Sequence, residues 1–306
     1  VDLEDLIVEE EVDEVVFSYS DLSHEAVMHR ASRALAAGAE FRILGTGMML
    51  SASVPVLAVD AVRTGCGKSA VSRKLADLLA EDLDVAVVRE PMPYGDLTEP
   101  VSRFDSLADL DAAGVTIEER EEYEHHLAAG HTVFAGIDYE AVLERAEAAG
   151  DVILWDGGNN ELPFFEPDVH IVLADPLRAG HELRYHPGET NLRLADYVLI
   201  PKENSASEEQ IATVVGNVTE TTPEAAIIHA DSVVSVTDPD RIAGKRVLAV
   251  EDGPTVTHGD ADRGAAAIAA QQYGAAEIVD PRPWAVGSIG SVFEKYPHLG
   301  PVLPAM

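Results

Sequence analysis

Residues 54–76 constrain the fold of this chain more than any other stretch. A short apolar run over residues 56–59 predicts a buried strand, and a glycine-bearing turn follows it. The turn Gly65-Cys66-Gly67-Lys68-Ser69 matches the G-x-G-K-[ST] end of a phosphate-binding P-loop. The next residues predict an amphipathic helix, with apolar positions at Val71, Leu75, Leu78 and Leu79. This order predicts an α/β protein that binds nucleotide phosphates; a strand–turn–helix unit without a ligand is the alternative.

Each residue type in the turn suits an anion. Gly65 and Gly67 allow the backbone to approach a phosphate and to point N–H groups at it, and the start of the helix adds its dipole. Lys68 is expected to neutralise the β- and γ-phosphates, and the Ser69 hydroxyl to bind Mg²⁺. The expected nucleotide-binding residues are Arg63, Thr64, Gly65, Cys66, Gly67, Lys68 and Ser69, together with Gly157 and Lys202 further along the chain.

Two positions depart from the usual motif. Val62 replaces the first glycine of the longer pattern G-x-x-x-x-G-K-[ST]. Arg63 stands where one class of P-loop proteins carries an additional lysine. Val62 leaves open a degenerate nucleotide-binding module without catalysis.

The chain is strongly acidic. Its 306 residues include 55 Asp and Glu against 21 Lys and Arg, which gives a formal net charge of −34, and 46% of its residues are apolar. An apolar content of this size predicts a folded protein. A folded, acidic, lysine-poor chain is typical of a cytoplasm at molar salt, where the Debye length is about 3 Å. An ordinary acidic protein is the alternative. Under both interpretations the acidic surface argues against nucleic acid as a partner.

The sequence contains no apolar run of membrane-spanning length and no visible signal peptide. We therefore expect a cytoplasmic protein with no membrane partner, and a homo-oligomer is one option. The single cysteine, Cys66, excludes disulfides within the chain, and it is either a reactive thiol or a small residue that fits the turn. Because the chain starts at Val1, we expect a piece of a longer protein.

The order of predicted elements suggests two domains. A strand over 14–19, a helix over 24–37 and a strand over 41–44 resemble the tail of a smaller Rossmann-like α/β domain, which we assign to residues 1–50. Residues 51–306 are expected to form a P-loop nucleotide-binding and catalytic domain. Its further strands are continuous β-branched runs, which predicts a mostly parallel sheet flanked by helices; they lie at 85–88, 152–155, 169–173, 197–200, 226–229 and 246–250.

Asp156 follows the apolar run 152–155 and precedes two glycines. In P-loop proteins an aspartate at this place holds Mg²⁺, and the following glycine approaches the γ-phosphate. An ordinary Asp-Gly turn is the alternative. Guanine-specific members read their base with N-K-x-D after a later strand, where this chain has Pro201-Lys202-Glu203-Asn204. The missing aspartate favours adenine.

Residues 175–193 concentrate bases in a chain that has few of them. We expect them to bind an anionic acceptor, since the arginine fork suits phosphate, with Arg178 and Arg184 also catalytic. Arginines that only pair with carboxylates are the alternative. The expected substrate-binding residues are Arg178, His181, Arg184, His186 and Arg193, with Arg89, Tyr94 and Arg103 on the other side of the pocket.

Several motifs together resemble the cyclic 2,3-diphosphoglycerate synthetases of archaea. They are VRTGCGKS, MPYGDL, EEREEYE, VILWDGGNN, DPLRAGHELRYHPGETNLR, VEDGPTVTHG and EKYPHLGPVLPAM, and they span nearly the whole chain. The resemblance implies an ATP- and Mg²⁺-dependent ligase, with K⁺ as a further candidate cation. It implies that 2,3-bisphosphoglycerate is closed into a ring by an intramolecular phosphoanhydride, with release of ADP and phosphate. Lys68, Asp156, Arg178 and Arg184 would be its catalytic residues. A GTPase switch or metallochaperone of the same P-loop class is the rival function.

Overall fold

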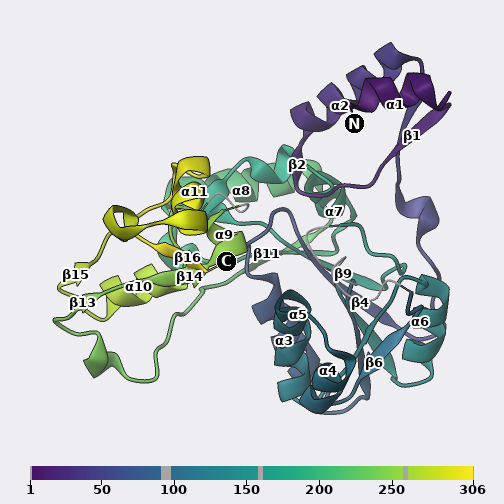
Figure 1. Cartoon of the computed structure of the whole chain (residues 1–306). Helices are drawn as coiled ribbons and strands as arrows, with labels where there is room; N and C mark the ends of the chain where they lie inside the picture. Colours follow the sequence, from purple (N-terminus) through teal and green to yellow (C-terminus); the bar gives the residue numbers. More distant parts are fainter. Residues whose placement is uncertain (1, 91–97, 158–160, 258–260, 306) are drawn as a thin grey trace. The chain divides into compact units, whose positions relative to one another are not determined.

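The computed structural model describes residues 2–90, 98–157, 161–257 and 261–305 (Figure 1). The chain divides into two compact units, Val1–Ala230 and Asp231–Met306. The boundary that we expected between residues 50 and 51 lies within the first unit.

The first unit contains an eight-stranded sheet in the order β12-β11-β9-β4-β8-β5-β7-β6. Its pairings are parallel except for that between β6 and β7, so the prediction of a mostly parallel P-loop-type α/β fold is confirmed. The phosphate turn follows β4, in the middle of the sheet. The strands are β4 (Val56–Ala61), β5 (Val85–Val88), β6 (Ser102–Phe104), β7 (Thr132–Ala135), β8 (Val152–Asp156), β9 (Val169–Leu173), β11 (Tyr197–Ile200) and β12 (Ala226–His229).

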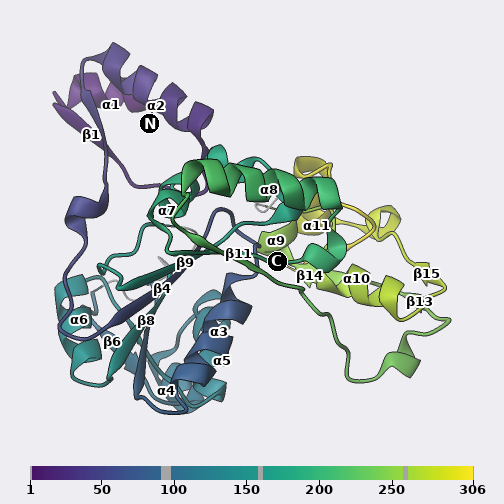
Figure 2. The same ribbon diagram turned by 180° about the vertical axis from the view of Figure 1, so that it is seen from behind.

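Helices cover both faces of this sheet (Figures 1 and 2). Side chains alternate along a strand, so Val59 and Ala61 of β4 pack in one core cluster and Val56 and Ala58 in the other. We call these sides the α3 face and the α6 face. The α3 face packs against α3 (Lys68–Leu79), α4 (Leu107–Ala113), α5 (Ile117–Ala128), α7 (Gly188–Leu194) and α8 (Glu208–Thr221), and the α6 face against α6 (Tyr139–Glu147).

Residues 2–43 form a small α/β element with a parallel strand pair, β1 and β3. Ser23 caps α2 by accepting the N–H of Ala26, and Gly38 ends it at φ 103°. The two-residue strand β2 pairs antiparallel with β10 (Tyr185–His186), which connects this element to the chain beyond β9. Its elements are α1 (Leu3–Glu9), β1 (Glu14–Phe17), β2 (Leu22–Ser23), α2 (His24–Ala37) and β3 (Glu40–Ile43).

The second unit has its own small core of Ala249, Val256, Ala267, Leu299 and Val302. Two parallel strand pairs, β13–β15 and β14–β16, surround this core. Its elements are β13 (Arg246–Val247), β14 (Val250–Asp252), α9 (Gly253–Val256), α10 (Ala265–Gln272), β15 (Glu277–Ile278), α11 (Gly287–Lys295) and β16 (Leu303–Ala305). Throughout the part of the chain that the structure describes, every helix is too short or too polar to cross a membrane.

Two helices differ from the sequence prediction. Leu78 was expected on the buried face of α3, but it is 47% exposed, and the buried residues are Ser72 and Ala76. The helix turns Ser72 inward because its hydroxyl donates to Asp156 at 2.8 Å. Helix α5 carries an acidic run, which is typical of a solvated face, yet its Tyr123 and His126 are buried.

Helix α7 packs tightly on the start of the phosphate turn. A Cβ atom on Gly188 would lie 2.3 Å from the carbonyl oxygen of Val62, so only glycine fits there. The Val62 side chain lies in the core of the α3 face, and its N–H donates to the Leu173 carbonyl at 2.9 Å. Val62 therefore fills core space just before the glycine turn.

This contact predicts that Gly188→Ala destabilises the protein by about 1–3 kcal/mol, because α7 or the turn must shift. Gly216→Ala is the matched control. It adds the same methyl group at an exposed position of α8, where a Cβ would meet nothing within 4 Å. This change should stabilise the protein by about 0.5–1 kcal/mol. Urea unfolding of both variants measures the difference. Equal effects would disprove the tight approach at Val62.

Candidate functional site

The phosphate turn has the backbone shape that its sequence predicts. Gly65 and Gly67 adopt left-handed conformations with φ of 78° and 103°, and α3 begins at Lys68. Ser69 is exposed in the first turn of this helix, and Thr64 is half-buried. Cys66 is buried, and burial raises the pKa of its thiol, which makes it unreactive. A small residue that fits the turn is the better interpretation of Cys66.

The Asp156 carboxylate at the end of β8 is fully buried beside this turn. Its Oδ1 accepts from Lys68 Nζ at 2.6 Å and from the Ser72 hydroxyl at 2.8 Å. Its Oδ2 lies 2.7 Å from Arg89 Nη1 and 3.0 Å from His126 Nε2. Burial disfavours the charged form, but Arg89 and Lys68 outweigh it and hold the pKa of Asp156 well below its usual range.

Lys68 is therefore held at the strand end by Asp156. Its ammonium group also donates to the carbonyl oxygen of Gly157. A nucleotide phosphate must replace these oxygens if Lys68 is to neutralise it. The hard oxygen donors of Ser69 and Asp156 suit Mg²⁺, although each Asp156 oxygen already has two partners.

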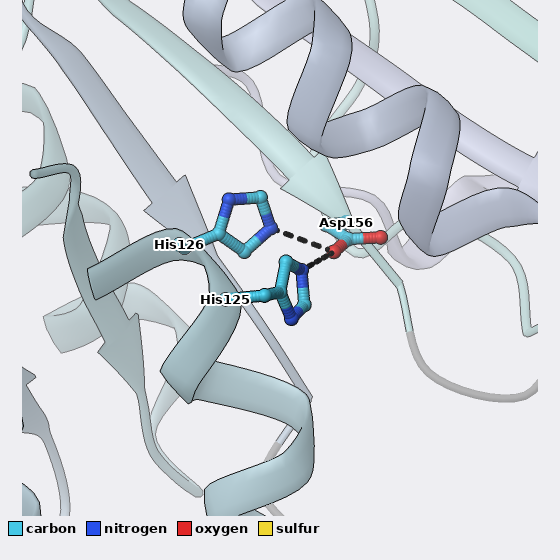
Figure 3. A group of neighbouring side chains, drawn as sticks. All are labelled: His125, His126 and Asp156. Atoms are coloured by element: carbon cyan, nitrogen blue, oxygen red, sulfur yellow. Dashed lines mark hydrogen bonds and ion pairs between the residues drawn. The ribbon is translucent and has the colours of Figure 1, made fainter. Parts of the chain in front are cut away.

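A pair of histidines from α5 reaches the same carboxylate, as Figure 3 shows. His126 is buried, and its ring lies 4.1 Å from that of His125. His125 Nδ1 lies 3.4 Å from the Glu121 carbonyl oxygen, and its Nε2 lies 4.0 Å from Asp156 Oδ2. Sequence reasoning missed both residues because they close an acidic run. Their position at the C-terminal end of a helix directly before a buried strand was the available signal.

These three side chains could also hold a metal ion, since their ligand atoms lie within 4.8 Å of one another. The electrostatics argue against it. The oxygen that both histidines face, Asp156 Oδ2, already lies 2.7 Å from Arg89 Nη1, so a metal ion on the histidines would lie beside a guanidinium ion. We assign the histidines to the hydrogen-bonded packing around Asp156. Burial and the neighbouring His126 lower the pKa of His125 to about 4, so the ring is neutral at pH 7.

Arg89 was expected to bind substrate, but its side chain is 2% exposed and forms ion pairs with Asp156 and with Glu122 of α5. Arg103 is exposed and pairs with Asp105 at 2.9 Å. The third residue expected on this side, Tyr94, lies outside the described residues.

Part of the basic segment 175–193 contacts the phosphate turn. Arg178 donates to Asp175 at 3.0 Å and lies 3.5 Å from the Cys66 sulfur. Arg63 lies 2.7 Å from His181 Nδ1, and its guanidinium stacks 3.6 Å from the centre of the Tyr185 ring. Arg63 Nε also donates to Asp21 at 2.6 Å, so this residue connects the turn to the N-terminal element.

Lys202 supports the turn from the end of β11. It donates to the Gly65 carbonyl at 2.6 Å and to Asp175 at 2.7 Å, which is a structural use of the lysine in the place of N-K-x-D. The structure thus brings Arg178, His181 and Lys202 to the turn.

The remaining basic residues have different surroundings. Arg184 is exposed, and Arg193 pairs with Glu189 at 2.6 Å on the surface. His186 lies in β10 opposite Leu22, and burial and the nearby His24 lower its pKa.

Comparison with known proteins gives one informative relative. The chain is 56% identical over 308 residues to "Arginine synthetase ArcE" of Thermococcus kodakarensis; the alignment covers all of this chain and 69% of the relative. No family model matches. Solved structures with a similar fold include LpxK of Aquifex aeolicus with ATP (15% identity, TM-score 0.48, covering 94% of this chain and 86% of that one). Hydrogenase maturation factor HypB of Archaeoglobus fulgidus is another (14% identity, TM-score 0.39, 58% and 81% covered).

The lowered pKa of His125 predicts a specific loss of stability in acid. The unfolded chain binds a proton near pH 6.5 and the folded one near pH 4, so stability falls as pH decreases through this window. His125→Gln should remove about 2–4 kcal/mol of that pH dependence. The control is His29→Gln, because His29 is 75% exposed. Urea unfolding between these pH values at constant salt measures it, and an unchanged slope in His125→Gln would contradict the assignment.

Proposed function

The chain belongs to the archaeal synthetase family of ArcE, and we propose that it uses ATP at the phosphate turn to drive a ligation. Its sequence motifs resemble those of the cyclic 2,3-diphosphoglycerate synthetases. The observation that carries this proposal is the placement of Lys68 between the turn and the buried Asp156. A lysine at a helix start, beside a strand-end carboxylate, can pass from the carboxylate to a developing phosphoryl charge.

We propose arginine as the product, following the name of the relative. An ATP-driven synthesis of a guanidino group has simple chemical requirements. A ureido oxygen attacks the γ-phosphorus of ATP, and the bond to the bridging oxygen breaks to release ADP. Ammonia then attacks the ureido carbon, the carbon–oxygen bond breaks to release phosphate, and a proton leaves with it. The ATP-derived phosphate thus removes the oxygen that ammonia replaces.

The residues of the α3 face fit the first of these steps. Lys68 and the N–H groups of the turn would hold the transferring phosphoryl group, and Arg89 would keep Asp156 charged. Mg²⁺, held by Ser69 and Asp156, would neutralise the phosphate charge. Lys202 would keep the Gly65 carbonyl turned away from the anion.

Cyclisation of 2,3-bisphosphoglycerate is the second candidate. It is favoured by the contacts of Arg178 and His181 with the phosphate turn, where a second anion could be held beside the γ-phosphate. Against it stand the carboxylate partners of Arg178 and Arg193, which already use part of this positive charge. The preference for adenine over guanine remains a prediction of both candidates.

Lys68→Ala should abolish ATP turnover, because a phosphoryl transition state loses its nearest cation; a loss of about a hundredfold or more is expected. Lys74→Ala is the matched control, since Lys74 is exposed on the same helix. Release of ADP at high KCl measures turnover, and circular dichroism checks folding. Equal activity of both variants would refute the role of Lys68.

The product distinguishes the two candidates. Full-length protein is incubated with ATP, ¹⁵N-ammonium and citrulline, the ureido counterpart of arginine, and separately with ATP and 2,3-bisphosphoglycerate. We expect ¹⁵N in the guanidino group of arginine, detected by mass spectrometry. A cyclic phosphoanhydride in the ³¹P spectrum of the second reaction, without labelled arginine in the first, would reverse the order of the candidates.

A further inference from the structure

The carboxyl edge of the sheet also carries functional groups on its α6 face. Asp60 follows Ala58 by two residues in β4, Glu90 follows Val88 by two, and Trp155 lies beside them in β8. By the alternation of side chains, all three belong to the side opposite Asp156 and Arg89. The phosphate turn described above uses none of them.

Among the residues that the structure describes, two fully buried polar atoms on this face have no hydrogen-bond partner. They are Asp60 Oδ1 and Trp155 Nε1, and both side chains are 0% exposed. Both atoms point toward Gly157, since a Cβ built there would lie 2.9 Å from the first and 2.6 Å from the second. The other Asp60 oxygen lies 2.8 Å from His170 Nε2. Buried polar groups in folded proteins are normally satisfied, so the Asp60 oxygen lacks a donor, whereas the Trp155 N–H lacks an acceptor.

A proton-sharing pair of glutamates lies at the same edge. Glu90 and Glu161 are hydrogen-bonded to each other, and burial together with the charge of Glu161 raises the pKa of Glu90 to about 9. Lys68 and Arg89 oppose this shift only in part. The charge of Glu161 also reaches Asp60, whose pKa burial raises. Burial and the charge of Glu161 thus disfavour the charged forms of both Asp60 and Glu90.

An aromatic wall adjoins the glutamates. Burial and the charges of Glu90 and Glu161 raise the pKa of Tyr139. The centre of the Tyr139 ring lies 4.2 Å from that of Phe164 and 6.3 Å from that of Trp155. Tyr139 and Phe164 also line an open pocket of about 590 Å³, together with Pro100 and Ile137. Carboxylates beside aromatic faces are the surroundings that organic cations prefer.

We propose that Asp60, Glu90, Glu161 and Tyr139 bind the cationic nitrogen group of the acceptor reaction, an ammonium or a guanidinium ion. This inference rests on the proposed synthetase function and names the second substrate's site. An N–H-donating cation would satisfy the free Asp60 oxygen and replace the proton shared by the glutamates. Lys68 interacts electrostatically with Glu90 and Glu161. The nucleotide and the cationic substrate would therefore meet across the edge of the sheet.

The test measures binding without turnover. Arginine and ammonium chloride are titrated separately into the full-length protein by calorimetry, at constant high KCl and at about pH 7.5. Arginine binding alone would identify a guanidinium site, and ammonium binding alone an ammonia site. Titration in buffers of different ionisation enthalpy should show release of about one proton, because the cation displaces the proton of the pair. Tetramethylammonium carries the charge but no N–H groups and should bind at least about tenfold more weakly.

Glu161→Gln and Glu90→Gln should each weaken binding at least about tenfold and remove the proton release. Glu144→Gln is the matched control, because it makes the same change at an exposed position of α6. No binding of either cation, binding without proton release, or competition by Mg²⁺ alone would overturn the site. Cation binding in a protein that makes no arginine would refute the proposed product and leave the site intact.

Discussion

The buried carboxylate of Asp156 is the interaction on which the nucleotide side of the structure depends. It receives Lys68, Ser72, Arg89 and His126 from three different elements, so one charge fixes α3 and α5 against the end of the sheet. Removing one partner of a buried ion pair costs about 3–5 kcal/mol. The arrangement is stable only while the charge of Asp156 is balanced by its cationic partners. A nucleotide phosphate can replace Asp156 as the anionic partner of Lys68.

At the carboxyl edge of the sheet, the two faces carry side chains of opposite charge. On the α3 face, Lys68 and Arg89 surround one carboxylate beside a turn of backbone N–H groups. On the α6 face, Asp60 lies beside Trp155, and Glu90 is hydrogen-bonded to Glu161. The proposed ligation, which joins an anionic nucleotide to a nitrogen base, would need both environments within reach of one another. Parallel strands supply this, because their carboxyl ends meet at one edge and their side chains alternate between its sides.

Much of the fold could be predicted from the sequence, because buried parallel strands and capped helices have local signatures. The phosphate turn and the strand leading to Asp156 are examples. The site was predictable only where a motif marks it. His126 was missed because its burial depends on how α5 packs, and Glu90 because its partner Glu161 is distant in the sequence. Arg89 was expected to face a substrate, but a charge buried by neighbouring elements cannot be recognised from its sequence context. The sequence also could not show that Asp21 would reach Arg63.

In the proposed reaction, Lys68 leaves Asp156 to hold the nucleotide phosphates. A crystal structure of the protein with Mg²⁺ and a non-hydrolysable ATP analogue tests this most directly. The account predicts that Lys68 Nζ contacts the β- and γ-phosphates, while Asp156 keeps Arg89 and His126 and turns its freed oxygen toward Mg²⁺ or its water. A nucleotide bound elsewhere, with Lys68 still paired to Asp156, would contradict it.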